Sequence, residues 1–243
     1  MNIYAQNNLN VNQFTTEGKD LLKAPGNWNS SELIKFGSIV GTTILLMHFD
    51  EDIREAAIRN DQFIKSVPAE FGRYWGEPFF TGVSALLFTI HGIAFNNTQH
   101  KKMGFEIIES GIYASAVTGV LKYSFGRARP LTGFDAFTYN PFSFSGNKYV
   151  SFSSGHTALA FSLSTVLSLN TENDFARVLL YVPAVMTATS RVYQNHHWTS
   201  DVFFGACIGY FVGKFFYDQH EINEKFEKIS PSKPLFSISL PIN

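Results

Sequence analysis

The chain has 243 residues, which is enough for one domain or at most two small ones. Lys and Arg number 19 and Asp and Glu number 20, so the net charge of −1 lacks the basic excess of a general nucleic-acid-binding protein. Charged residues are 16% of the chain, against about 25% in an average globular protein, and aromatic residues are another 16%, which excludes a disordered chain, a collagen and a coiled coil. The single Cys207 excludes an internal disulfide and a zinc site of the paired-cysteine kind.

The first 30 residues predict an irregular N-terminal arm. They are polar and rich in Asn, and Pro25-Gly26-Asn27 is typical of a turn. Ile3-Tyr4-Ala5-Gln6 also resembles the end of a signal peptide, which would imply export.

Six uncharged stretches predict six helices in one helical domain over residues 31–220, and therefore an all-α six-helix bundle. They are Phe36–Phe49, Pro78–His100, Ser110–Leu121, Tyr149–Thr171, Val178–Ser190 and Val202–Gly213. A membrane-spanning helix needs about 20 apolar residues, and three of these stretches have only 12 or 13. The mean hydropathy of −0.01 is low for six spans, and Glu106 and Glu109 fall inside the third helix, where lipid would make them costly. Composition alone leaves a membrane bundle and a soluble bundle equally open.

Four further segments have patterns of their own. Asp50-Glu51-Asp52 resembles an acidic first turn and predicts an amphipathic interfacial helix over 50–67. Residues 130–151 predict a long functional loop. Gly205, Gly209 and Gly213 form a small-residue stripe that lets another helix approach closely. The remaining residues, 221–243, predict a polar C-terminal tail in which Leu235–Leu240 alternates like one short strand.

Two clusters of polar residues lie at predicted helix ends. Lys122 and Arg129 lie seven positions apart where the third helix ends, and Pro130 biases Arg129 out of the helix. Ser154-Gly155-His156 stands before an apolar run, so the backbone N–H groups of a helix N-terminus would offer an anion site beside a histidine.

A third cluster joins Ser190-Arg191 to His197 and Asp201. On a helix, His197 and Asp201 share one face, and a carboxylate in that position fixes the orientation of an imidazole. Each cluster alone also fits a helix cap or a structural pair. Together they provide three cations, an anion-binding helix start and two histidines, which points to a phosphate-processing site.

These motifs resemble those of a known family. Lys122-x6-Arg129-Pro130, Ser154-Gly155-His156 and Ser190-Arg191-x5-His197-x3-Asp201 are similar, in order and spacing, to the three signatures of the type 2 phosphatidic acid phosphatase superfamily. That superfamily includes class A acid phosphatases, glucose-6-phosphatase and vanadium haloperoxidases. The resemblance runs from about Phe79 to Phe216. Ser153 stands where the family usually has a proline, which shapes a turn and supplies no chemistry.

The resemblance implies a set of phosphate-binding residues. Lys122, Arg129 and Arg191 would bind the equatorial phosphoryl oxygens, where charge develops in the transition state. Ser154 and the Gly155 N–H would add hydrogen bonds. No metal and no cofactor are expected.

The resemblance also implies the chemical roles. His197 would attack phosphorus to give a phosphohistidine, with Asp201 holding its other nitrogen, and His156 would protonate the leaving oxygen and then activate water. His196 lacks the correct spacings. His48, His91, His100 and His220 have no comparable context and are expected to be structural or solvated.

The leading hypothesis is a phosphatase that removes a terminal phosphate from a lipid: phosphatidate, phosphatidylglycerol phosphate, a polyprenyl pyrophosphate or a lipid A phosphate. The aromatic residues Phe134, Phe137, Tyr139, Phe142 and Phe144 of the loop suit a headgroup region. The expected partners are this lipid and the membrane, with no nucleic acid and no obligate protein partner.

Lys101 and Lys102 favour a cytoplasmic second connection in an inner membrane, with the active site on the periplasmic side. The alternatives are a soluble periplasmic acid phosphatase for small organic phosphates and, less favoured, a vanadium haloperoxidase.

Overall fold

The computed structural model describes residues 7–59, 66–143 and 146–229, with only the backbone for 226–229. Within these ranges the chain is all-α, and the extended pairing is limited to an isolated bridge between Arg127 and Tyr139. The predicted fold class is confirmed.

The α-helices are α1 (Val11–Lys23), α2 (Ser30–Ile58), α4 (Val67–Trp75), α5 (Pro78–Ala94), α6 (Thr98–Phe125), α7 (Gly155–Leu169), α8 (Asp174–Leu179), α9 (Val182–Tyr193) and α10 (Thr199–Ile229). Each of the six predicted helical stretches coincides with one or two of them.

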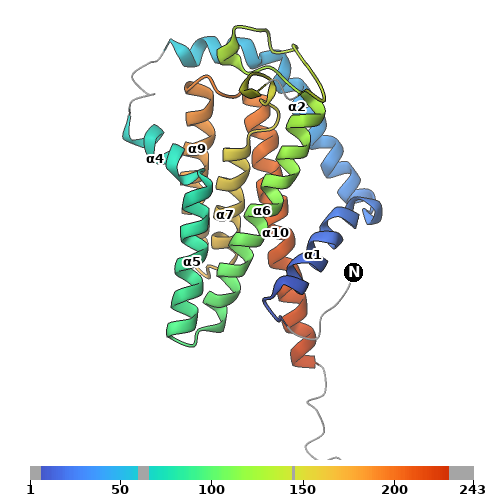
Figure 1. Cartoon of the computed structure of the whole chain (residues 1–243), viewed down its shortest axis with the longest axis vertical. Coiled ribbons are helices and arrows are strands. Elements are labelled where there is room, and N and C mark those ends of the chain that lie inside the picture. Colours follow the sequence, from blue (N-terminus) through green and yellow to red (C-terminus); the bar gives the residue numbers. More distant parts are fainter. Residues whose placement is uncertain (1–6, 60–65, 144–145, 230–243) are drawn as a thin grey trace, which may run out of the picture.

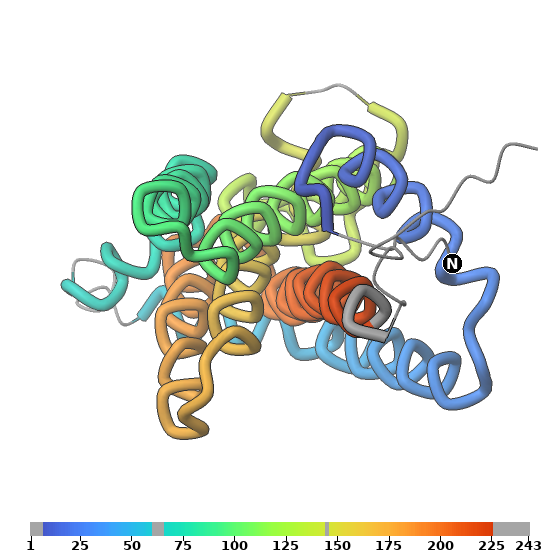
Figure 2. Tube along the Cα trace, turned by 90° about the horizontal axis from the view of Figure 1, so that it is seen from below, coloured from blue at the N-terminus to red at the C-terminus, as the bar shows by residue number. Residues whose placement is uncertain are grey.

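The bundle itself consists of α5, α6, α7, α9 and α10, which lie side by side, with α4 packed on α9 (Figure 1). The sixth predicted helix, α2, does not complete the bundle. It crosses the outside obliquely against α10, and its C-terminal part passes over the end where α6 finishes. Seen from below, α10 lies between α6 and α2 (Figure 2). The expected six-helix bundle is therefore wrong in detail, because α2 is longer than its uncharged stretch and lies across the others.

The expected irregular N-terminal arm is also wrong. Residues 11–23 form α1, and residue 30 already belongs to α2. The Asn residues that suggested a loop act as helix caps: the Asn10 side chain accepts from the Gln13 N–H, and Asn29 forms a capping box with Glu32. Ile3-Tyr4-Ala5-Gln6 lies outside the described residues.

The predicted separate amphipathic helix over 50–67 does not form as one element. Residues 50–58 continue α2 without a break, and α4 begins at Val67 after its own cap, Ser66. Asp50 is buried at 1% exposure, so it is not the exposed start of a helix. The prediction from Asp50-Glu51-Asp52 was wrong because the Asp50 carboxylate is buried and paired with a cation.

The long loop over 130–151 is confirmed in its described part. It contains only two short 3₁₀ turns, Pro130–Thr132 and Gly146–Tyr149. In the predicted polar tail, residues 221–229 continue α10, whereas the predicted strand Leu235–Leu240 lies outside the described residues.

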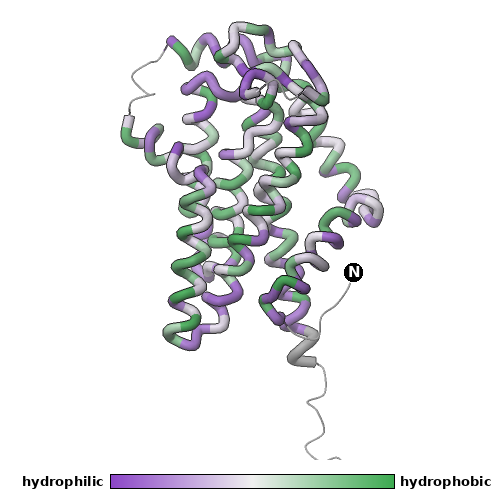
Figure 3. The backbone as a smooth tube through the Cα atoms, viewed as in Figure 1, coloured by the Kyte–Doolittle hydropathy of each residue, from purple (hydrophilic) through white to green (hydrophobic). Residues whose placement is uncertain are grey.

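The bundle exposes many apolar side chains, and its interior combines hydrophobic clusters around Ile107, Leu163 and Phe216 with buried small and hydroxyl residues. Exposed on the outer faces are Leu33, Ile34, Phe36, Ile44, Leu45 and Phe49 of α2, and Leu86, Leu87, Ile90 and Ile93 of α5. Fully buried are Ser110, Ser162, Ser164, Thr165, Ala114, Ala158 and Ala160. Figure 3 shows hydrophobic residues along much of the bundle helices and hydrophilic residues at the turn between α5 and α6. Among the described helices, α2 alone is long and apolar enough to cross a membrane.

The glycine stripe of α10 sets its distance from α7. A Cβ on Gly205 would meet the Ser154 carbonyl, one on Gly209 would overlap the Ala158 carbonyl oxygen, and one on Gly213 would lie 3.0 Å from the Ser162 carbonyl oxygen. The predicted close helix approach is confirmed. Because α7 and α10 each carry predicted site residues in their first turns, this contact also sets how closely those first turns approach one another.

We expect Gly209→Ala to destabilise the fold and Gly119→Ala to leave it unchanged or more stable. The added methyl at 209 overlaps the α7 backbone and should cost about 1–3 kcal/mol. Gly119 lies within α6 with nothing within 4 Å of an added Cβ, so Ala should gain up to about 1 kcal/mol in helix propensity. Thermal unfolding of the two purified variants measures the difference. Equal stability of the two would contradict the close contact.

Candidate active site

The residues of all three motifs meet at one end of the bundle. There α6 and α9 end while α7 and α10 begin, so side chains far apart in the sequence reach one space. The residues are Lys122 in the last turn of α6, Arg129 just after it, Ser154 and His156 at the start of α7, Arg191 near the end of α9, and His197 and Asp201 around the start of α10. Gly126 ends α6 in the left-handed conformation (φ 57°), where a Cβ would overlap the Asn140 carbonyl.

The three predicted phosphate ligands have no ion-pair partner among the described residues. Lys122 Nζ donates to the Val150 carbonyl (2.6 Å), and Arg191 Nη2 donates to the Gln194 side-chain oxygen (2.6 Å). Arg129 Nε is buried without a hydrogen-bond partner. Neutral acceptors leave the positive charges uncompensated, and three such cations in a partly buried space favour an anion.

The start of α7 faces the same space. A Cβ on Gly155 would lie 3.8 Å from Cε of Lys122, so the helix N-terminus and this cation are adjacent. The buried Ser154 hydroxyl hydrogen-bonds the Thr157 hydroxyl (2.9 Å), and its N–H donates to the Asp201 carbonyl (3.1 Å). The helix dipole therefore adds to the positive potential.

His197 is buried, and its orientation is fixed. Its Nδ1 lies 2.8 Å from the Ser151 carbonyl oxygen, an acceptor only, so Nδ1 carries the hydrogen and Nε2 keeps a free lone pair. Burial lowers the pKa of His197 to about 3; Asp201 opposes this shift, whereas the positive charge of Lys122 adds to it. The imidazole is therefore neutral at ordinary pH, which suits a nucleophile.

Asp201 holds His197 less directly than the motif implied. Its Oδ2 lies 3.8 Å from Nδ1, whereas it accepts from the Ser151 hydroxyl (2.5 Å) and the Trp198 N–H (2.9 Å). The carboxylate thus positions Ser151 and the turn that carries His197. Ser151 is a site residue that sequence reasoning missed, because its role comes from its backbone carbonyl.

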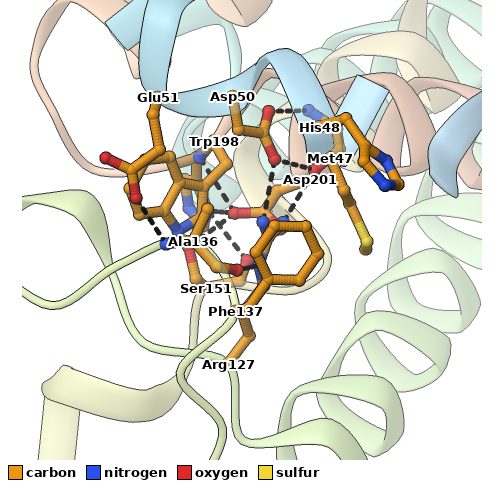
Figure 4. Close-up of polar contacts among 12 residues, drawn as sticks. Met47, His48, Asp50, Glu51, Arg127, Ala136, Phe137, Ser151, Trp198 and Asp201 are labelled. Atoms are coloured by element: carbon orange, nitrogen blue, oxygen red, sulfur yellow. Dashed lines mark hydrogen bonds and ion pairs between the residues drawn. The ribbon is translucent and has the colours of Figure 1, made fainter. Parts of the chain in front are cut away.

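Arg127 is the second residue that the sequence motif did not assign, although it lies between Lys122 and Arg129. Its guanidinium is fully buried and bridges two carboxylates, donating from Nη1 to Asp201 (2.8 Å) and from Nη2 to Asp50 of α2 (2.8 Å) (Figure 4). Its Nε donates to the Ala136 carbonyl in the loop (2.8 Å). One side chain therefore joins α2, the long loop and the first turn of α10.

Further bonds complete this cluster. The Ser200 N–H and hydroxyl both donate to Asp50 (2.9 and 2.5 Å), and the Glu51 carboxylate accepts from the Ala136 N–H (2.8 Å) (Figure 4). The Trp198 indole donates to the Ala128 carbonyl (2.8 Å), and Arg127 lies over its ring. All the polar groups are paired, as a buried ion network requires.

His156 has a carboxylate neighbour that the sequence did not indicate. Its Nε2 lies 3.5 Å from Glu77 Oε1, and Glu77 is the residue that precedes α5. The predicted acid–base residue is half-buried, so it lies between the interior cations and the outside. A lone Glu before a proline gave no signal of this contact.

The comparisons agree with this geometry. The sequence matches the PAP2 superfamily over residues 104–225, which is half of the chain and includes every predicted site residue. The chain therefore belongs to the PAP2 superfamily.

Two relatives are similar over different extents. The chain is 33% identical over 124 residues to the lipid A 1-phosphatase of Porphyromonas gingivalis, a match that covers 49% of this chain and 25% of that protein. The crystal structure of Aquifex aeolicus LpxE superposes with a TM-score of 0.52 at 23% identity, over 70% of this chain and 95% of that one, which shows a shared fold.

We expect Arg127→Met to unfold the protein far more readily than Arg54→Met. Removing the guanidinium leaves Asp50 and Asp201 buried without a cation, which costs about 3–5 kcal/mol. Arg54 also lies over Trp198, but its Nε donates to the neutral Asn195 side chain, so its loss should cost about 1 kcal/mol. Chemical denaturation of both variants gives the comparison. Similar midpoints would show that the bridge contributes little.

Proposed function

We propose that this protein is a metal-independent phosphatase that removes a terminal phosphate from a lipid through a phosphohistidine on His197. The observation that carries the proposal is the convergence of Lys122, Arg129 and Arg191, none paired with a described carboxylate, around a neutral His197. Membership of the PAP2 superfamily supports it.

In the first step, Nε2 of His197 attacks phosphorus and the bond to the ester oxygen breaks. The three cations stabilise the charge on the equatorial oxygens. His156 gives its proton to the leaving oxygen, so the alcohol departs neutral. The Ser151 carbonyl accepts from Nδ1–H throughout, which keeps Nε2 directed at the phosphate.

In the second step, water attacks the phosphohistidine. His156, now neutral, takes a proton from this water, and the P–N bond breaks to release inorganic phosphate and restore His197. Burial, together with the positive charge of Arg191, lowers the pKa of His156 to about 4, and Glu77, 3.5 Å from its Nε2, opposes this shift and so supports return of the proton before the next turnover. Asp201 and Arg127 act only as positioning residues.

The apolar exterior supports a lipid substrate and an embedded bundle. Exposed Leu, Ile and Phe side chains cover α2 and α5 in larger numbers than a water-soluble surface usually carries, which suits contact with lipid. The loop beside the site exposes Phe134, Phe137, Tyr139 and Phe142, amphipathic or apolar aromatics that suit the headgroup level. Phe144 lies outside the described residues.

The side of the membrane that the active site faces was inferred from Lys101 and Lys102. Lys101 and Lys102 begin α6 at the end opposite Lys122, so the site and this connection face opposite sides of a spanning bundle. However, Lys102 is buried and paired with Glu221 and Glu224, so it is not a free cytoplasmic charge. The periplasmic active site therefore remains part of the proposal.

Among lipid phosphates, the name of the Porphyromonas gingivalis relative makes a lipid A phosphate the first substrate to test, before phosphatidate, phosphatidylglycerol phosphate and polyprenyl pyrophosphate. Release of the protein from membranes without detergent, together with turnover of small organic phosphates only, would favour the soluble acid phosphatase. Halide oxidation dependent on added vanadate would favour a haloperoxidase.

We expect His197→Ala to abolish phosphate release from all four lipids while the fold is kept. A phosphohistidine should be trapped by rapid quenching with labelled lipid in the unaltered protein and be absent from this variant. His196→Ala is the matched control. The His196 ring is next to His197 in the sequence but lacks the contact with the Ser151 carbonyl, so this variant should still form the covalent species. Trapping in His197→Ala would assign the nucleophile elsewhere.

We expect His156→Ala to separate substrates by their leaving groups. Proton delivery contributes typically about 10²–10⁴-fold, so a lipid phosphate should lose activity by that factor. An aryl phosphate such as p-nitrophenyl phosphate, whose leaving group needs no proton, should lose much less, and the phosphohistidine should still form. Asp201→Asn should reduce both substrates together, because it disturbs the turn that holds His197. Equal losses in His156→Ala would show that His156 only binds phosphate.

A further inference from the structure

A second cluster of ionisable side chains lies far from the active site. Glu17 of α1, Glu106 and Glu109 of α6 and His220 of α10 are all 0% exposed. His220 lies 19 residues after Asp201 along α10, a separation of roughly 28 Å on a straight helix. The proposed phosphatase mechanism uses none of the four.

The contacts of His220 resemble those of a metal-bound histidine. Its Nδ1 lies 3.3 Å from Glu106 Oε1, and the other Glu106 oxygen accepts from the Asn170 side chain (2.7 Å). This contact is an ion-pair distance and not a hydrogen bond, but a carboxylate beside Nδ1 favours a hydrogen on that nitrogen and leaves Nε2 as the ligand. Nε2 points at Glu17 Oε2 (3.0 Å) and Glu109 Oε2 (3.4 Å).

The two facing carboxylates differ in a way that indicates a missing partner. Glu17 is oriented by hydrogen bonds from Gln13 (2.9 Å) and Asn223 (3.2 Å) to its Oε1, which leaves Oε2 toward His220. Neither oxygen of Glu109 has a hydrogen-bond partner, although the side chain is fully buried. A buried carboxylate without hydrogen bonds is costly, so a group that binds it would stabilise the fold.

The charges point the same way. Three buried carboxylates meet a single described cation, His220, because nearby Lys102 is paired with Glu221 and Glu224. With His220 protonated, ionised carboxylates leave a net charge of −2. With His220 neutral and a divalent ion present, the net charge is −1, and the orphan oxygens of Glu109 gain a ligand bond.

We propose that Glu17, Glu109 and His220 form a structural zinc site that ties α1 to α6 and α10. Tetrahedral ligands at zinc distances lie about 3.4 Å apart, close to the 3.0 and 3.4 Å observed here, and the ligand atoms of all three residues lie within 4.8 Å of one another. One nitrogen and two carboxylates are a common donor set for this ion. Zinc at this distance from His197 takes no part in phosphoryl transfer.

The test measures zinc directly on the full chain, purified in detergent without chelator or a histidine tag. After dialysis against EDTA, calorimetric titration with ZnCl₂ should give one site per chain and a rise in the thermal unfolding midpoint. Failure of the unaltered chain to bind zinc in titration overturns the proposal, whatever the variants do. Activity is a separate readout, so loss of the proposed phosphatase function would not affect this result.

Variants locate the ion. Glu109→Gln should lose zinc binding, and Glu106→Gln, which changes the support of His220 without removing a zinc ligand, should weaken it roughly 10–100-fold. Asp218→Asn, a carboxylate of α10 outside the cluster, and His100→Gln, which removes the exposed His91–His100 contact, should bind zinc as the unaltered chain does. If Glu109 is held by a proton and does not bind zinc, Glu109→Gln should have the same thermal unfolding midpoint as the unaltered chain, and added zinc should change both midpoints equally. That result overturns the proposal, as would loss of zinc in His100→Gln.

Discussion

The active site depends on one buried ion bridge, from Arg127 to Asp50 and Asp201. Asp201 orients the turn that carries His197, Asp50 anchors α2 over the end of the bundle, and the Arg127 Nε binds the loop. A guanidinium suits this position because its planar fork donates in several directions at once, which a lysine cannot do. The cations proposed to bind phosphate, Lys122, Arg129 and Arg191, have no ion-pair partner among the described residues. Burial lowers the pKa of Lys122 to about 7, so a bound anion would favour its charged form.

The bundle also separates two kinds of polar chemistry. At one end, cations and a helix N-terminus surround a neutral His197 and favour an anion. At the other end, three carboxylates surround His220 and favour a cation. Between them, α7 and α10 pack through glycine, serine and alanine, so the two ends are joined by a narrow, rigid contact. Small residues at this helix contact let the two backbones approach closely.

Some errors of prediction have a common physical origin. Asn10 and Asn29 were interpreted as loop residues because Asn favours turns, but the same side chain also caps helices. Which of the two occurs depends on whether the residues that follow fold into a helix. Asp50 resembled an exposed helix start because acidic residues favour that position. Its partner Arg127 lies 77 residues away, which no local pattern can reveal.

The sequence by itself determined the all-α class, the helical stretches of the bundle and the residues proposed to bind phosphate. Helix periodicity and helix ends are local properties, and Lys122, His156, Arg191 and His197 stand at helix ends within recognisable spacings. Only the tertiary structure decided the partners: Ser151 for His197, Asp50 for Arg127, Glu77 for His156, and Glu17 for His220 across 203 residues. Ion pairs and hydrogen bonds depend on distance in space, and burial, which sets their strength, is fixed only when the helices pack.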